Sequence, residues 1–152
     1  MVSFDLSNPF TFSLKDGDTE TTINGTFREL TKSERLSLKQ KSEKIEAVTK
    51  KAISLLDKKA RNERLITVKE KSEDWKGVEK LIIEVNKIDE ELQTIQDTFD
   101  ADKEKESLQK ESFELRLGGQ DRAQIMELAE AHGYDAVISV IVEAIQEAKA
   151  GK

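Results

Sequence analysis

The chain has 152 residues and a net charge of −6, and 37% of its residues are charged against 36% hydrophobic. This composition is typical of long solvent-exposed helices and coiled coils, and an aromatic content of 5% excludes a large aromatic core. Without cysteine there is no disulfide, thiolate nucleophile or cysteine-based metal site. Because no secretion signal or membrane-spanning stretch is recognisable, we expect a cytoplasmic protein with no membrane partner.

Strand-like alternation marks the first thirty residues. Apolar and polar residues alternate over 2–6 and again over 10–14. Asp16-Gly17-Asp18 is typical of a turn, and Asn24-Gly25 is a candidate for a second turn or a bulge. We therefore predict a small antiparallel β-hairpin or meander over residues 1–30, with a phenylalanine face that needs a covering helix.

A long helix is predicted to follow. Thr31 and Glu34 have the spacing of a capping box, in which each side chain accepts a backbone N–H of the other residue. No proline or glycine interrupts the chain until Gly77, and we place the end of the helix between residues 62 and 68. One apolar stripe runs along it through Ile45, Val48, Ala52 and Leu55.

The clearest periodic signal predicts a second long helix, capped by Ser72 and continuing to about Gln109. Its apolar residues recur at intervals of three and four: Trp75, Val78, Ile82, Val85, Ile88, Leu92, Ile95 and Phe99. A long helix cannot bury such a seam alone, so we predict a long antiparallel helical hairpin over residues 31–112.

Charge is segregated along the chain, with a net of −3 over residues 1–31, +7 over 32–71 and −10 over 72–152. We expect the basic first helix to pair with the acidic second one. Because each exposed ion pair contributes only about 0.2–1 kcal/mol, such pairs would act on register and partner choice more than on stability.

The last forty residues predict a pair of short helices over 113–152. Asp121 and Asp135 are candidate caps for the two helices, and Gly133 suits the left-handed residue that ends the first. The final helix is apolar on more than one face, so it is either buried or offers a surface to a partner. The three segments are expected to form one cooperative domain with an extended arm.

No motif points to catalysis or metal binding. The acidic runs at Asp16 and Asp100 lack the glycine of a calcium loop, and Gly118-Gly119 lacks the lysine of a phosphate loop. His132, the only histidine, suits the C-terminal end of a helix. We therefore expect no enzyme activity, no catalytic residue, no metal and no cofactor.

The basic segment offers an alternative, because nine lysines and arginines between Lys39 and Arg64 could follow phosphates. No aromatic residue is interleaved with them for base stacking, and an acidic segment follows in the same chain. Pairing with the acidic helix explains the same residues, so nucleic acid is the less favoured partner.

Two stretches resemble phage tail assembly chaperones. One runs from Phe10 to Glu34 and includes the step Phe27-Arg28-Glu29-Leu30-Thr31; the other is Gly133-Tyr-Asp-Ala-Val-Ile138. The resemblance covers about the first thirty-five and the last thirty residues, whereas the central hairpin departs from the compact helical members of that family. It implies a protein of the host cytoplasm that binds the tape-measure protein, a long helical chain, before the tail tube polymerises around it. It brings no catalytic residues.

Our leading hypothesis is an assembly chaperone or adaptor that binds a helical structural protein and keeps it soluble. There are two alternatives. One is a coiled-coil structural protein of a phage particle that self-associates into a homo-oligomer, and the other is a nucleic-acid-binding helical protein. We expect the partner to bind the apolar faces of the β-hairpin and of the last helix. The residues on these faces are Phe10, Phe12, Phe27, Val137, Ile138, Ile141 and Ile145.

Overall fold

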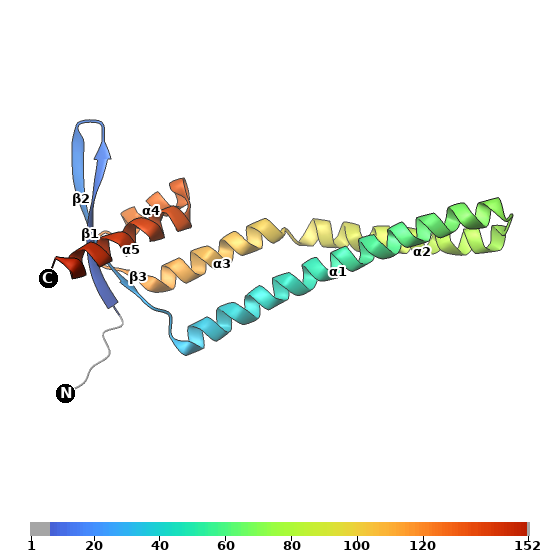
Figure 1. Ribbon diagram of the computed structural model, residues 1–152, viewed down its shortest axis with the longest axis horizontal. Coiled ribbons are helices and arrows are strands. Elements are labelled where there is room, and N and C mark those ends of the chain that lie inside the picture. The colour runs from blue at the N-terminus through green and yellow to red at the C-terminus, as the bar shows by residue number, and fades with distance from the viewer. Residues whose placement is uncertain (1–6, 152) are drawn as a thin grey trace. The chain divides into compact units, whose positions relative to one another are not determined.

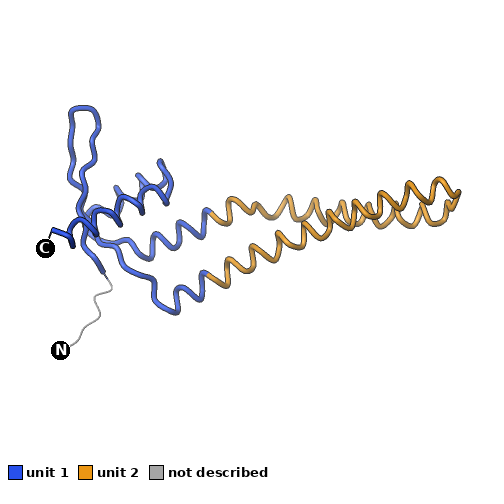
Figure 2. The backbone as a smooth tube through the Cα atoms, viewed as in Figure 1, with its two compact units in different colours: residues 1–38, 106–152 blue, residues 39–105 orange. Residues whose placement is uncertain are grey.

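A computed structural model describes residues 7–151 (Figure 1). The expected strand residues Val2, Phe4 and Leu6 lie outside this range. The described chain is mainly helical with a small antiparallel sheet, which confirms the predicted mainly α (α+β) fold. It divides into two compact units: one holds the residues up to Leu38 together with those from Glu106 onward, and the other is Lys39–Lys105 (Figure 2).

The sheet is built on a hairpin of two ten-residue strands, β1 (Ser7–Asp16) and β2 (Thr19–Arg28). The predicted turn between them is present, and Gly17 has a φ of 61° that suits glycine. A third strand, β3 (Leu117–Gly118), comes from far along the chain and pairs antiparallel with β2, so the strand order is β1-β2-β3.

Asn24-Gly25 lies inside β2 and forms no turn, which corrects one expectation. Gly25 is the register partner of Phe10. A Cβ on Gly25 would come within 2.6 Å of Cζ of the Phe10 ring, so glycine here makes room for a core aromatic side chain.

Helix α1 (Lys32–Lys71) begins at the predicted capping box. The N–H of Glu34 donates to Thr31 Oγ1 at 3.2 Å, and the N–H of Thr31 donates to Glu34 Oε1 at 2.9 Å. The helix continues past the predicted window and ends at Lys71, because the chain carries no helix-breaking residue before the turn at 72–74.

The second predicted helix is two helices, α2 (Trp75–Thr98) and α3 (Ala101–Arg116). Asp74, not Ser72, caps α2 and accepts the N–H of Gly77 at 3.1 Å. The break falls at Phe99, whose backbone is extended, and at Asp100, whose Oδ1 accepts the N–H of Lys103 at 3.2 Å. A carboxylate that can cap a new helix thus interrupts an otherwise continuous helical pattern.

Helices α4 (Arg122–His132) and α5 (Tyr134–Ala150) form the predicted C-terminal pair. Gly133 separates them with a φ of 95°. Asp121 precedes α4 without a capping hydrogen bond and instead accepts the backbone N–H of Asn24 at 2.8 Å, which ties α4 to β2. Asp135 lies in the first turn of α5, where a negative charge suits the helix dipole.

The core of the first unit lies where α3, α4 and α5 meet one face of the sheet. Its aromatic contacts are Phe27 with Phe113 and Phe113 with Tyr134, whose ring centroids are 6.0 and 5.6 Å apart. The buried residues of this core are Phe10, Ile23, Phe27, Phe113, Leu117, Ile125, Ala129, Tyr134, Val137, Ile141 and Ala144.

Candidate protein-binding surfaces

Within the second unit, α1 and α2 pack side by side (Figure 2). Along each helix, the positions that are buried or half-buried recur at intervals of three and four residues, and together they form a seam. This is the spacing of a coiled coil. On α1 the seam positions include the predicted Ile45, Val48, Ala52 and Leu55 and continue through Lys59, Asn62, Ile66 and Lys69. On α2 they are Val78, Leu81, Val85, Ile88, Leu92 and Ile95, and half-buried Phe99 follows directly after the helix.

Two residues predicted for the pairing lie outside this seam. Trp75 is 63% exposed beside the turn, and Ile82 is 44% exposed. Leu81 takes the seam position expected for Ile82, because the interval after Val78 is three residues and not four. Both Leu81 and Ile82 fit an interval of three or four residues after Val78, so only the packing in the structure shows which of the two is in the seam.

Polar contacts cross the seam and show that the two helices run antiparallel. Lys59 Nζ lies 2.7 Å from Asp89 Oδ1, and Asn62 Nδ2 donates to Glu84 Oε2 at 3.2 Å. Residue numbers rise on one helix as they fall on the other. The hydrogen bond to Asp89 raises the pKa of Lys59. Buried Asn62 fixes the register, since a shifted pairing would bury its amide without a partner.

The residues expected to bind a partner lie in or against the core of the first unit. Phe10, Phe27, Val137 and Ile141 are buried there. Phe12, Ile138 and Ile145 are half-buried and pack against the same cluster. The chain itself therefore covers most of the apolar surface that the alternation in the strands and in the last helix suggested. On α5 the exposed large apolar side chains are Val140 and Val142.

The apolar residues whose exposure the sequence did not predict are mainly on the helical hairpin. Seven large hydrophobic side chains of the second unit are between 41% and 63% exposed: Ile53, Leu56, Leu65, Val68, Trp75, Ile82 and Ile83. The available signal was the surplus of apolar residues beyond those needed for one seam. It could not be interpreted without knowing which positions the seam uses.

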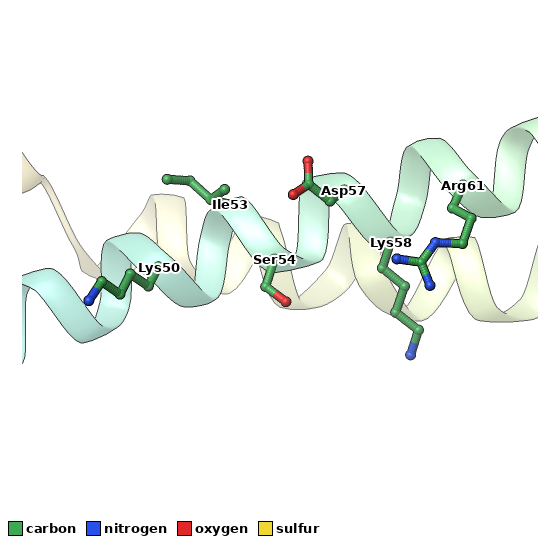
Figure 3. Close-up of a pocket in the computed structure, with 6 residues that line it drawn as sticks. All are labelled: Lys50, Ile53, Ser54, Asp57, Lys58 and Arg61. Atoms are coloured by element: carbon green, nitrogen blue, oxygen red, sulfur yellow. The ribbon is translucent and has the colours of Figure 1, made fainter.

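A shallow hollow lies on the surface of α1 (Figure 3), and all six residues that line it come from this helix. They are Lys50, Ile53, Ser54, Asp57, Lys58 and Arg61. Because one helix surface cannot enclose a small molecule, the hollow suits contact with another chain better than ligand capture.

The entry to α1 carries the largest pKa change in the described chain. Both guanidinium nitrogens of Arg28 donate to the carboxylate of Glu34, at 2.7 and 2.8 Å. The hydrogen bonds from Arg28 are the main cause that lowers the pKa of Glu34 to about 2, and the hydrogen bond from the N–H of Thr31 is the second. Arg116 lies 4.1 Å from the centroid of the Phe27 ring and donates from Nε to the carbonyl oxygen of Arg28 at 2.8 Å. The cluster holds β2, α1 and α3 together through residues of the first unit.

The acidic runs and the histidine are placed as follows. Asp16 and Asp18 flank the β1–β2 turn, Asp100 precedes α3, and His132 is the exposed last residue of α4. Over residues 7–151, no three His, Asp or Glu side chains group closely enough to hold a metal ion. Within the same residues, no helix is both long and apolar enough to cross a membrane.

The chain was compared with protein-family models, curated proteins and solved structures, and none of the three comparisons returned a match. The functional argument therefore rests on the surfaces described above.

Proposed function

We propose that this protein is an adaptor that binds a helical structural protein and keeps it soluble before assembly, as a phage tail assembly chaperone does. One observation carries the proposal. The hairpin of α1 and α2 closes its seam within one chain and still exposes seven large hydrophobic side chains. Ile53 with Leu56, and Leu65 with Val68, are three residues apart on one helix and so are neighbours on its surface. Neighbouring exposed apolar side chains are a feature of surfaces that bind other proteins.

The mechanism is shielding of the partner. A long amphipathic helix exposes an apolar stripe until its own assembly is complete, and a helical surface can cover that stripe by side-chain packing at intervals of three and four residues. Ile53, Leu56 and Trp75 supply apolar contacts from both helices of the hairpin. The charged residues around them keep the complex in solution. In this role the protein needs no catalytic group and no cofactor.

The proposal is tested by co-expression with a long helical structural protein of the tape-measure kind. We expect the wild-type protein to raise the soluble fraction of that partner and to co-purify with it. The variant Ile53→Ser/Leu56→Ser/Val68→Ser/Trp75→Ser removes exposed apolar contacts from the hairpin and should lose the partner.

A matched control is Leu36→Ser/Val140→Ser/Val142→Ser, which changes exposed apolar side chains of the first unit. This control should retain the partner. The proposal fails if the wild-type protein repeatedly recovers no partner, or if both variants recover as much of it as the wild type does. Circular dichroism checks that each variant is folded.

A further inference from the structure

One face of α1 combines basic and apolar side chains and lies away from the seam. Its positions recur at intervals of three and four residues: Lys50, Ile53, Asp57, Arg61, Arg64 and Val68, with Ser54, Lys58 and Leu65 beside them. We call this set the α1 stripe. Five of these positions are two residues beyond a seam position, which is about 200° around the helix, and Ile53 is two residues before the seam position Leu55. From Lys50 to Val68 the stripe is about 27 Å long.

The basic residues of the α1 stripe have no partner of their own. Among residues 7–151, the ion pair between α1 and α2 is Lys59–Asp89, and Lys69 pairs with Asp74 at the turn. Lys50, Lys58, Arg61 and Arg64 form no ion pair with any described residue. The pairing of α1 with α2 thus uses few of the basic side chains of α1. Four of those basic side chains remain available on one face of the helix.

The apolar members of the stripe identify the kind of partner. Ile53 is 54% exposed and Val68 is 61% exposed, and both are flanked by basic residues. A phosphate backbone makes no use of aliphatic side chains. A helix with an apolar stripe and acidic flanks satisfies both the aliphatic and the basic residues.

A second copy of the chain fits less well through its α2 helix. Glu84 and Asp89, two of the acidic residues of α2, are already engaged by Asn62 and Lys59. The remaining charged residues of α2 are four acidic and three basic, so that helix offers the stripe almost no net charge. Charge complementarity therefore does not favour a second copy that binds through α2.

We infer that the α1 stripe is a docking site for an acidic amphipathic helix of a partner protein. The inference rests on the proposed function and specifies which face of the hairpin receives the partner. Apolar contacts at Ile53, Leu65 and Val68 supply affinity. The four basic residues select acidic flanks and set the direction of the bound helix.

The test uses a synthetic fluorescent helical peptide of about three heptads with leucine along one stripe and glutamate on both flanks. A second peptide carries lysine in place of every glutamate. Fluorescence anisotropy is measured with the full chain at about 50 and 500 mM salt, because screening weakens exposed charge contacts. We expect the acidic peptide alone to bind, and to bind more weakly at the higher salt concentration.

The decisive variant is Arg61→Glu/Arg64→Glu, whose side chains are exposed, so folding should be unaffected. It should weaken binding of the acidic peptide by about tenfold, since two attractive contacts become repulsive. The matched control is Lys76→Glu/Lys80→Glu, which reverses two exposed charges on α2 and should bind as the wild type does. Equal binding by all three proteins, or a preference for the basic peptide, overturns the inference.

Two further results would also overturn it. If a duplex DNA oligonucleotide binds through Arg61 and Arg64 and the acidic peptide does not, the stripe is a nucleic-acid site. If the wild-type protein forms a dimer that Arg61→Glu/Arg64→Glu abolishes, the occupant is a second copy.

The co-expression assay separates this inference from the proposed function. If Arg61→Glu/Arg64→Glu still solubilises the tape-measure protein as the wild type does, the docking face is wrong and the adaptor function stands. If the acidic peptide binds at the stripe while the wild-type protein solubilises no partner, the docking face stands and the adaptor function is wrong.

Discussion

Glu34 performs two structural tasks with one carboxylate. It completes the capping box with Thr31, and it receives both nitrogens of Arg28 from the end of β2. The capping box follows from residue spacing, so the sequence predicted it. The bond to Arg28 depends on how the chain turns between the strand and the helix, and residue spacing alone does not determine that turn.

The lowered pKa of Glu34 makes stability depend on pH. The folded-state pKa is about 2 against a usual 4.5, so the contribution is complete above pH 4.5 and is lost as the pH falls toward 2. Glu34→Gln should therefore lower stability at pH 7, and the difference from wild type should shrink between pH 4.5 and 2. Urea denaturation across this range measures it, with exposed Glu43→Gln as the control. A difference that stays constant with pH would contradict the prediction.

Gly25 is a second residue whose identity is set by packing. The Phe10 ring that a Cβ would meet stacks on Phe12, with 6.0 Å between ring centroids, and the same Cβ would lie 3.0 Å from Cδ1 of Ile125. We expect Gly25→Ala to reduce the free energy of unfolding by about 1–3 kcal/mol, as overpacking does. Thr22→Ala, an exposed change in the same strand, should cost less than about 1 kcal/mol. Chemical denaturation measures both variants. If Gly25→Ala and Thr22→Ala lose the same free energy of unfolding, the Phe10 ring moves aside without cost and the prediction is wrong.

At the scale of elements, the helical hairpin was the most predictable part of the fold. Intervals of three and four residues on two long segments require a paired seam, and the structure has one. The details that failed are those that periodicity cannot resolve. Leu81 and Ile82 both fit the pattern after Val78, and Asp100 ends a helix in a run that is otherwise helical.

Asn62 is the polar position in this seam and should limit how the helices can associate. Replacing it with leucine adds apolar contact and removes the amide that requires Glu84 as a partner. We expect Asn62→Leu to raise the thermal unfolding midpoint and to broaden the range of oligomers seen by sedimentation velocity. Asn86→Leu, at an exposed position of α2, should not raise the midpoint. A variant that is less stable and has an unchanged sedimentation profile would argue against a register role.

Elements built from distant segments were not predictable. Strand β3 has two residues and exists because Leu117 and Gly118 meet β2 more than eighty residues away in sequence. The phenylalanine face of β1 and β2 was recognised as needing a covering helix. However, the pattern did not show that Phe10 and Phe27 of the sheet would be buried in one core with Val137 and Ile141 of α5. An apolar face has the same periodicity whether its partner is the same chain or another.

For the whole molecule, the segregation of charge has a different consequence from the one that the sequence suggested. We expected the basic first helix and the acidic second helix to neutralise each other across the seam. In the described chain, Lys59–Asp89 is the ion pair that joins them. The basic side chains that remain on α1 are the basis for the inferred docking site.

The central claim is that the hairpin satisfies its own seam and binds a separate helical chain with what remains exposed. Molar mass by light scattering after size-exclusion chromatography tests it most directly, over a wide concentration range and with or without the tape-measure protein. We predict a monomer of 17.2 kDa for the protein alone and a complex of fixed stoichiometry with that partner. A mass that rises with concentration for the protein alone, with no complex formed, would contradict the claim and indicate a self-assembling structural protein.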